Sequence, residues 1–529
     1  MDATTEDLFR RLERLNDIGA SLSYERHLPR LLEKILLAAK SITHADGGTL
    51  YLVSEDRQRL HFEIVRNDTL KIAFGGTSGQ PISDKFGDLP LYNAEGEPNN
   101  SMVAAYATLT GNTVNIADAY AAEGFDFSGT CRFDQNTGYR SQSFLTVPLK
   151  NHESEIIGVL QLINALDPDS GKVREFSKAD QRLAESLASQ AAVALTNRQL
   201  VQQLETLFEA FIGLINTAID EKSPYTGGHC QRVPVLTMLL AEAASEITEG
   251  PLADFQLTDK DRYELKIAAL LHDCGKVTTP VHVVDKATKL QTIFDRIHLI
   301  DTRFEVLKRD AEIASLKAQA GGEAAAVAEA RLAQQLAQIE DDRNFLRRAN
   351  IGGERMRDED IERVRQIASR YRWCNVQGEE VPFLDADELE NLTIRAGTLT
   401  AAEREIINHH IVATIKMLEQ LPWPKHLKNV PEYAGGHHER MDGKGYPKGL
   451  RREEMSVQAR IMGIADIFEA LTAKDRPYKE GMKLSQALSI LENFKNNGHI
   501  DPDLYEVFVS SAVYRDYAQV FLNPAQTDC

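Results

Sequence analysis

Long apolar runs and cysteines are both scarce in this chain of 529 residues. No apolar run approaches the roughly 18 residues that a membrane-spanning helix needs, and the N-terminal segment MDATTEDLFRRLERL lacks the apolar stretch of a signal peptide. The 5 cysteines are scattered without paired ligand spacing, which excludes a disulfide framework and favours reduced thiols. We therefore expect a cytoplasmic protein that makes no membrane contact.

Positive charge is also in short supply. The chain has 60 lysines and arginines against 79 aspartates and glutamates, a formal net charge of −19. A surface this acidic repels polyphosphate chains, so nucleic-acid polymers and anionic membranes are poor partners. A small anionic substrate can still bind if cations gather at its site. The apolar share of 43% is ordinary for globular proteins, so the chain can bury a large core.

The N-terminal third combines helical and strand-like patterns. Residues 5–40 carry apolar side chains at helical spacing, and strand-like runs follow at 47–53, 60–65, 143–149 and 156–164. Short strands between flanking helices predict one mixed α/β domain with an antiparallel sheet.

A helical stretch begins at Ser177 and runs past the end of this domain. Apolar residues recur along it at alternating steps of four and three, at Leu200, Leu204, Leu207, Phe211 and Leu214. This spacing is typical of a short coiled coil. We therefore assign 196–218 to a linker helix that joins two domains in a parallel homodimer, in preference to a helix packed on its own domain.

From about residue 205 onward the pattern is almost wholly helical. The stretch 301–390 differs because it is rich in Ala, Glu, Gln and Arg, with Gly321 and Gly322 between two periodic arms. We interpret it as a helical hairpin inserted into a C-terminal helical domain that spans 205–515, and we assign it no chemistry.

Histidines and carboxylates recur downstream of the linker in an order typical of a metal centre. The set is His229, His272, Asp273, His410, His437, His438 and Asp466. Imidazoles and carboxylates suit borderline or hard divalent metals. Asp273, beside His272, can bridge two cations, and such a pair supplies hydroxide near neutral pH and stabilises charge on an attacked phosphorus. A hydrogen-bonded core histidine is the plainer interpretation of any single member, but not of the ordered set.

Helical patterns place two of these groups. An amphipathic helix ends at His272 and Asp273, where Gly275 permits a turn and Lys276 supplies a cation suited to phosphate. A second apolar face predicts the helix that carries Asp466.

Two motifs resemble the HD-GYP subgroup of the HD phosphohydrolase superfamily: LLHDCGK at 270–276 and HHERMDGKGYPKGL at 437–450. The likeness extends through 219–233 and 459–478 and covers most of 205–515 apart from the inserted hairpin. Members of this subgroup are all-helical and hydrolyse the bacterial second messenger cyclic di-GMP with iron or manganese. The resemblance implies a metal-dependent phosphodiesterase that opens cyclic di-GMP to linear pGpG, with GMP as a further product.

The resemblance also implies roles for single residues. The metal ligands would be His229, His272, Asp273, His410, His437, His438 and Asp466. Asp273, Lys276 and Glu469 would form the catalytic set, and Lys276 and Arg476 would contact the phosphate of the substrate. The loop Gly445, Tyr446 and Pro447 would line the substrate groove, where glycine allows close approach and tyrosine stacks on a base.

The chain departs from the subgroup pattern at a few positions. Tyr225 stands where some members carry a glutamate that helps to hold a third metal, so we expect two divalent ions. Glu469 replaces an aspartate, and one extra residue precedes Arg476. The pattern places a ligand histidine ten residues after Thr400, which selects His410 and leaves the neighbouring histidine, His409, on the helix surface.

Residues 133–164 are similar to part of the cyclic-nucleotide-binding GAF domains, and the likeness covers about 25–195. Of the N-K-F-D-E signature of those domains, Asn164 and Asp180 are present, whereas Ala165, Ala179 and Gln181 replace the other three residues. The resemblance implies a sensor for an unknown small molecule; a domain that serves only in dimerisation is the alternative. We thus expect a multidomain α+β protein: an N-terminal helix over 1–24, a GAF-like α/β domain, a coiled-coil linker and an all-α HD-GYP domain.

Two other functions stay open. In one, the C-terminal region is a signalling scaffold that binds a cyclic dinucleotide with weak catalysis. In the other, the same metal chemistry acts on another cyclic dinucleotide. The intact ligand set favours an enzyme, and base selectivity depends on groove contacts.

Overall fold

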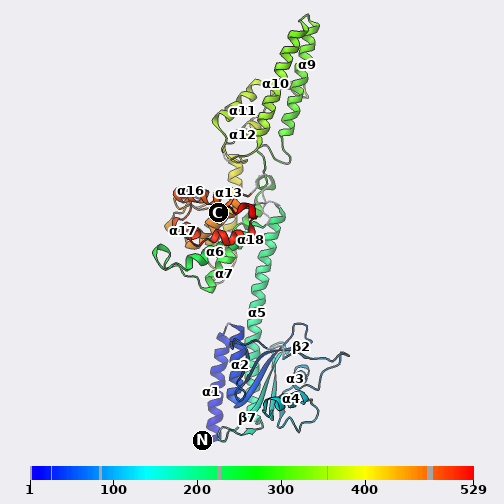
Figure 1. The fold of residues 1–529 in the computed structure, drawn as a ribbon, viewed down its shortest axis with the longest axis vertical. Helices are drawn as coiled ribbons and strands as arrows, with labels where there is room; N and C mark the ends of the chain where they lie inside the picture. The colour runs from blue at the N-terminus through cyan, green and yellow to red at the C-terminus, as the bar shows by residue number, and fades with distance from the viewer. Residues whose placement is uncertain (1–2, 26, 83–85, 223–227, 354, 474–480) are drawn as a thin grey trace. The chain divides into compact units, whose positions relative to one another are not determined.

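A computed structural model describes residues 3–25, 27–82, 86–222, 228–353, 355–473 and 481–529. The chain divides into two compact units, Met1–Phe208 and Glu209–Cys529. Helix α5 (Lys178–Lys222) begins in the first unit and ends in the second (Figure 1). Among the helices of the described residues, none has the length and apolarity to cross a membrane.

The first unit is built around an antiparallel sheet. Its central strand β1 (Ala45–Val53) pairs with β2 (Arg59–Asn67) on one side and with β7 (Ile156–Leu166) on the other. β6 (Phe144–Lys150) follows beyond β7. These four strands are those that the sequence patterns predict. Four shorter strands complete the sheet: β3 (Ile72–Gly75), β4 (Leu89–Pro90), β5 (Val114–Ile116) and β8 (Val173–Arg174).

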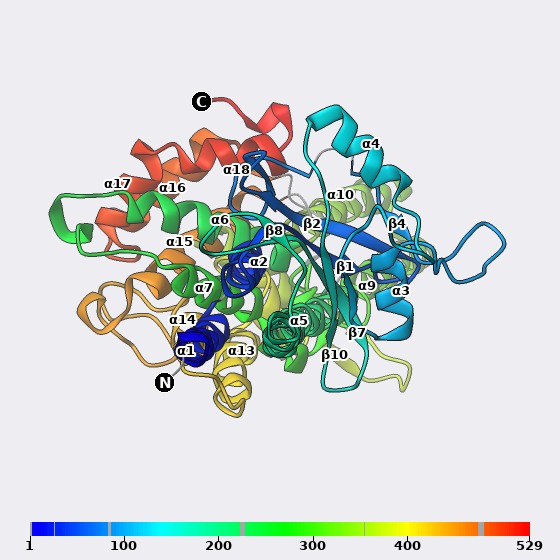
Figure 2. The same cartoon turned by 90° about the horizontal axis from the view of Figure 1, so that it is seen from below.

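Helices cover both faces of this sheet. α1 (Ala3–Tyr24), α2 (Leu28–Thr43) and the first part of α5 lie on one side, and α3 (Val103–Thr110) and α4 (Ser128–Thr137) lie on the other (Figure 2). This arrangement is the mixed α/β domain that the sequence predicts.

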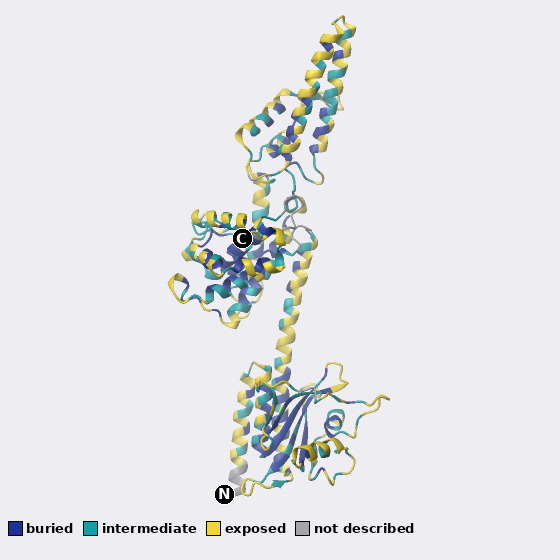
Figure 3. Cartoon of the chain, viewed as in Figure 1, coloured by how far each residue is buried: buried dark blue, intermediate teal, exposed yellow. Residues whose placement is uncertain are grey.

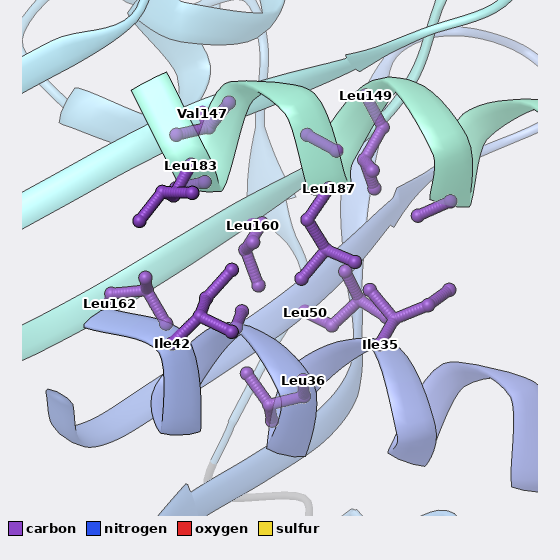
Figure 4. Packing of buried hydrophobic residues seen from close by; sticks show 14 of the residues in the cluster. Ile35, Leu36, Ile42, Leu50, Val147, Leu149, Leu160, Leu162, Leu183 and Leu187 are labelled. Carbon is purple, nitrogen blue, oxygen red and sulfur yellow. The ribbon is translucent and has the colours of Figure 1, made fainter. Parts of the chain in front are cut away.

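The alternation of side chains along β1 explains the two layers. Leu50 packs into the cluster formed with α2 and α5, where Ile35 and Leu187 meet it (Figure 4). Its neighbour Tyr51 points to the opposite face and packs against Ala105 of α3. Successive strand residues face opposite sides of a sheet, so one strand supplies both cores.

The two GAF-signature residues have structural partners. Asn164 has a φ of 55°, and its Oδ1 accepts hydrogen bonds from the backbone of Gln142 and Ser143 at 2.7 and 3.2 Å. Asp180 is buried and pairs with Arg11 at 2.5 Å and with Arg174 at 2.7 Å. Although burial opposes ionisation, hydrogen bonds from these arginines and Ser177 hold the pKa of Asp180 below its usual value. Both residues therefore stabilise the fold of this unit.

The second unit is largely helical. The helices that carry or directly precede the predicted ligands are α6 (His229–Ser245), α7 (Asp259–Leu271), α13 (Ala401–Glu419), α14 (Val430–Gly435) and α15 (Val457–Thr472). α6 packs against α7 and α15, and α14 packs against α7 and α13. Three shorter helices complete the packing: α16 (Leu484–Asn496), α17 (Pro502–Ser510) and α18 (Val513–Phe521).

The inserted stretch contains the expected hairpin and more. α9 (Ile297–Ala320) and α10 (Ala325–Asn350) form its arms, with Gly321 and Gly322 between them. They are followed by α11 (Asp358–Arg370), a two-stranded sheet of β9 (Arg372–Cys374) and β10 (Glu380–Pro382), and α12 (Ala386–Leu392). The all-α expectation is thus corrected at one place. Strands of three residues are too short to show the two-residue alternation of a strand in the sequence. In the structure, an aromatic cluster of Phe304, Tyr371 and Phe383 adjoins them.

Candidate metal centre

The turn that follows α7 packs very closely against α13. Gly275 lies in the short 3-10 helix η2 (Cys274–Thr278), and its N–H donates to the hydroxyl of Thr414 at 2.9 Å. A methyl group at Gly275 would lie 2.0 Å from the carbonyl oxygen of His410. Glycine is therefore needed here for close approach. This contact brings Asp273 beside His410, with Oδ1 and Nε2 3.3 Å apart.

One group of ligand atoms surrounds the other carboxylate oxygen of Asp273. Its Oδ2 lies 3.0 Å from His229 Nε2 and 3.2 Å from His272 Nε2. Asp466 Oδ1 lies 3.3 Å from His229 Nε2. The ligand atoms of His229, His272 and Asp273 all lie within 4.8 Å of one another.

A second group lies on the Oδ1 side of Asp273. It consists of His410, His437 and His438, whose ligand atoms also lie within 4.8 Å of one another. His438 Nε2 is 3.3 Å from His410 Nε2. The ring of His437 lies 4.9 Å from that of His272, centroid to centroid, so the two groups adjoin. Asp273 thus lies between them, as a bridging carboxylate must.

The hydrogen bonds of the imidazoles fix which nitrogen is free. Nδ1 of His272, His410 and His437 donates to a backbone carbonyl three residues earlier, at 2.7, 2.5 and 2.6 Å. A carbonyl only accepts, so Nδ1 carries the proton and Nε2 presents a lone pair. Nδ1 of His229 faces the carboxylate of Glu469 at 2.5 Å. Three Nε2 lone pairs therefore converge on the centre. Although burial opposes the charge, Asp273, Asp466 and Glu469 hold the pKa of His229 well above its usual range, so His229 would give up a proton to bind metal.

The charge states also suit a metal site. Although burial opposes ionisation, Lys276 and His272 hold the pKa of Asp273 well below its usual range. Burial, reinforced by the nearby His410, lowers the pKa of His438 to about 4. Burial and two neighbouring imidazoles hold the pKa of His437 well below its usual range. Near neutral pH the carboxylate is charged and these two imidazoles are neutral, which are the forms that bind metal.

Two buried acceptors test whether a cation fits. Asp273 Oδ1 and His437 Nε2 have no hydrogen-bond partner among the described residues. A buried acceptor without a partner is costly, and a divalent cation would satisfy both atoms. The donor set, its protonation and these two atoms all fit divalent metal ions.

Glu469 does not lie among the converging ligand atoms, although the resemblance implies a catalytic role for it. It lies behind His229, on the side away from the converging Nε2 atoms, and its Oε1 accepts a hydrogen bond from Arg232 at 2.6 Å. A carboxylate behind a ligand histidine orients the ring and strengthens the ligand. Asp466 and Glu469 stand three residues apart on α15, a spacing that places both on one helix face. Arg232 lies within the stretch 219–233 to which the family likeness extends, but the sequence patterns assign it no role.

Lys276 pairs with a ligand of the centre. Its Nζ lies 2.6 Å from Asp273 Oδ2, and its side chain is 21% exposed. Although burial opposes the charge, Asp273 and Asp466 raise the pKa of Lys276. A charged amine that is part-exposed beside these atoms can bind an anion.

The loop after His438 forms one wall of a cleft. The ring of Tyr446 stacks on His438 at 4.8 Å between centroids. A methyl group at Gly445 would lie 2.4 Å from the backbone nitrogen of Arg440, so glycine lets the loop fold back on itself. Buried Glu439 accepts hydrogen bonds from the backbone of Lys448 and Leu450 at 2.7 and 2.9 Å. Glu439 therefore holds the loop in shape, a role that the sequence did not reveal.

The cleft has a volume of about 450 Å³. His437, His438, Gly445, Tyr446 and Asp466 line it, together with Arg440, Lys444 and His499, which the sequence did not point to. His499 stacks on Phe494 and comes from a part of the chain without a motif. The cleft thus opens directly onto the candidate metal centre and carries cations at its wall.

The structure brings all seven predicted ligands together. The residue beside one of them, His409, is exposed, whereas His410 is buried. Pro447 belongs to the same loop but is not among the described residues that line the cleft. Arg476 and Tyr225 lie outside the described residues.

Family comparisons agree with this geometry. Residues 27–195 match the GAF domain family, and residues 226–361 and 386–504 match two families described as HD domain. The chain joins a GAF domain to an HD domain. The HD domain is of a metal-dependent kind, and the two groups of ligands lie within its matched segments or at their edges.

Several relatives are named as phosphodiesterases. The 3′3′-cGAMP-specific phosphodiesterase 3 of Vibrio cholerae is 33% identical over 303 residues, which is 56% of this chain and 39% of that protein. The 3′3′-cGAMP-specific phosphodiesterase 1 of the same organism is 37% identical over 99 residues, or 19% of this chain and 22% of that protein. A cyclic di-GMP phosphodiesterase of Pseudomonas aeruginosa is 35% identical over 117 residues, or 22% of this chain and 27% of that protein. The chain therefore spans less than half the length of each.

Among solved structures, the GAF domain from an Acinetobacter phosphoenolpyruvate-protein phosphotransferase is 17% identical. It covers 37% of this chain and 98% of its own, with a TM-score of 0.27.

The contact behind His229 predicts an effect on metal affinity. Glu469→Gln keeps the size of the side chain but weakens the acceptor that holds His229 in its ligating form. We expect the affinity for Mn(II) to fall about 10- to 100-fold, measured by calorimetric titration of apoprotein. The matched control is Glu453→Gln, an exposed glutamate. Equal affinities for the two variants would contradict the positioning role.

Proposed function

We propose that this protein is an HD-GYP-type phosphodiesterase that hydrolyses cyclic di-GMP to linear pGpG, with GMP as a further product. The observation that carries the proposal is the place of Asp273, with one oxygen beside His229 and His272 and the other beside His410. The phosphodiesterase names of the relatives support the same reaction class.

Each half of the centre would hold one divalent ion, with iron or manganese as the proposed metal. His229, His272, Asp273 and Asp466 would hold one ion, and His410, His437, His438 and the second oxygen of Asp273 the other. When bound, such ions supply Lewis acidity and activate water near neutral pH. They also add about +4 of charge in a cleft of an otherwise acidic protein, which favours a phosphodiester anion.

The side chains around the centre would bind and orient the substrate. Lys276 is within reach of Asp273 and would exchange part of that contact for a phosphate oxygen. Arg440 and Lys444 lie at the cleft wall, where they contact the carboxylate of Asp442 at 2.8 and 3.6 Å. The second phosphate would compete with Asp442 for these cations. Tyr446 would stack on a base, because its ring already lies flat against His438 and lines the cleft.

A second substrate has support of its own. Two relatives are named for 3′3′-cGAMP, and cations at the cleft wall would recognise phosphate, which both dinucleotides carry. Product analysis with a panel of cyclic dinucleotides, under Fe(II) and Mn(II) in turn, would identify the preferred substrate. A scaffold with weak catalysis would bind members of the panel and release no linear product.

Loss of the ligands predicts loss of turnover. His272→Ala and Asp273→Ala should each lower the rate of cyclic di-GMP hydrolysis by at least about 1,000-fold, because each removes part of the site for divalent metal. The rate is measured by chromatography of products, and circular dichroism checks folding. The matched control, His409→Ala, changes an exposed histidine beside a ligand and should keep the full rate. Full hydrolysis by the Asp273→Ala protein would overturn the proposal.

We also propose that two copies pair in parallel along α5. Leu204 and Leu207 are 65% and 52% exposed, and Phe211 and Leu214 are 56% and 64% exposed. Figure 3 colours each residue of the described chain by its burial. With Leu200, these four residues form a continuous apolar stripe at coiled-coil spacing. The same stripe on a second copy would cover it, since leucines at these steps interlock with their equivalents.

Charge placed in this stripe should separate the copies. Leu204→Asp combined with Leu214→Asp would put like charges face to face, so we expect the mass measured by analytical ultracentrifugation to change from dimer to monomer. Gln202→Asp with Thr206→Asp adds the same charge on exposed positions off the stripe and should leave a dimer. A wild-type monomer at micromolar concentration would contradict the pairing.

The end of α5 offers a route for regulation by the GAF domain. Lys222, the last residue of α5, donates from Nζ to the carbonyl oxygen of Lys276 at 3.3 Å and to that of Val277. These carbonyls belong to η2, the turn that follows Asp273. A shift of α5 would therefore act on the turn that carries Lys276, and we propose that ligand binding to the GAF domain uses this contact.

Removal of this amine should loosen the turn. Lys222→Met loses two hydrogen bonds from a charged donor, worth roughly 1.5–3 kcal/mol each. We expect at least about tenfold faster amide hydrogen exchange in residues 274–278 and a lower rate of hydrolysis. Arg198→Met, which changes another cation on α5, is the control and should leave both unchanged. If amide hydrogen exchange in residues 274–278 is unchanged in Lys222→Met, the proposed route is wrong.

A further inference from the structure

The inserted subdomain contains a second cleft, rich in cations. It has a volume of about 390 Å³ and lies where α10, the loop to α11 and the segment after α12 meet. Six positively charged residues line it: Lys289, Arg348, Arg355, Arg357, Arg363 and Arg395. Among the described lining residues Asp360 is the one acid; Glu354 lies outside the described part of the chain. The cleft is therefore positively charged in a protein whose net charge is −19.

Three of these cations already form ion pairs with carboxylates. Arg357 pairs with Asp360 at 3.1 Å, and Arg395 pairs with Asp358 at 2.5 Å. Arg363 pairs with Asp341 at 2.6 Å, and its guanidinium lies over the ring of Phe345 at 4.2 Å. These pairs hold the walls of the cleft in place and contribute little net charge.

The other three cations have no carboxylate partner among the residues that the structure describes: Lys289, Arg348 and Arg355. Arg348 and Arg355 are exposed, whereas Lys289 is only 2% exposed. Its Nζ donates to the carbonyl oxygens of Ile394 at 2.8 Å and Leu392 at 3.2 Å. Burial lowers the pKa of Lys289 to about 8. A buried amine with only neutral acceptors is costly to charge, and an anion in the cleft would offset that cost.

We propose that this cleft binds a small phosphate-bearing molecule, with Arg348 and Arg355 as its contacts. Lys289, whose Nζ already donates to Ile394, Leu392 and the sulfur of Met356, would add a buried positive charge in the wall. Arginine guanidinium groups match phosphate oxygens in pairs, and a lysine adds a point charge. The volume is in the range of small-molecule sites, and the acidic surface elsewhere disfavours a polyanionic chain. Ile351 and Met356 add an apolar wall, which suits the nucleoside part of a nucleotide.

The cleft is separate from the metal centre but is joined to α13. Met356 N–H donates to the carbonyl of Arg395 at 2.7 Å, and Gly397 N–H donates to that of Gly353 at 2.9 Å. A few residues later Glu403, which caps α13, accepts hydrogen bonds from Lys286 at 2.6 and 2.8 Å. A ligand in the cleft would therefore tighten the segment that leads into the helix carrying a metal ligand.

Binding to the full-length protein tests the proposal. The probes are inorganic phosphate, GMP and cyclic di-GMP, and the readouts are calorimetry and hydrogen-exchange protection of residues 345–363. Arg348→Ala with Arg355→Ala should weaken binding at this cleft by at least about 100-fold, since each charge-assisted bond contributes roughly tenfold or more. Arg309→Ala with Arg331→Ala removes the same charge elsewhere in the hairpin and should bind as wild type does.

A metal-site variant separates this cleft from the proposed active site. Asp273→Asn should lose turnover yet keep the protection of residues 345–363, so failure of the proposed function would leave this inference standing. Protection by phosphate alone at equal strength would identify the free anion as the ligand, and tighter binding of GMP or cyclic di-GMP would identify a nucleotide. Absence of protection by all three probes, or equal binding by the two double variants, would overturn the proposal.

Discussion

The HD domain depends on one close contact between two pieces of backbone. Gly275 lies against the carbonyl of His410 and the hydroxyl of Thr414, with no room for a side chain. Because η2 follows α7 and His410 lies on α13, this contact sets the distance between ligands that are far apart in the sequence. Asp273 faces both groups of imidazoles only while the two elements touch.

The surrounding structure keeps these ligands ready for a cation. Backbone carbonyls hold the outer nitrogens of His272, His410 and His437, and Glu469 holds that of His229. The imidazole rings would therefore not need to reorient to bind a metal. Burial leaves Asp273 Oδ1 and His437 Nε2 without a hydrogen-bond partner among the described residues. Buried acceptors without partners are costly, and a divalent ion would satisfy them.

The sequence indicated which side chains converge because histidine-aspartate pairs and the long glycine-tyrosine-proline loop are specific local patterns. It indicated the long strands for a similar reason, since β1 and β7 show a clear strand pattern over many residues. The short strands β9 and β10 carry too few residues to show any period. Arg232, Glu439 and His499 act through partners that are distant in the sequence or are backbone groups, and no local pattern encodes such contacts.

The inserted hairpin is anchored at one end. Its buried apolar contacts, such as Phe304 and Phe345, lie near the base, where Asn350 also accepts a backbone hydrogen bond from Lys289. Between the arms, ion pairs such as Lys308 of α9 with Glu340 of α10 hold the two helices together. Arms joined in this way can gain or lose whole helical turns while the base stays unchanged. The hairpin can thus vary in length during evolution without displacing a single ligand of the HD domain.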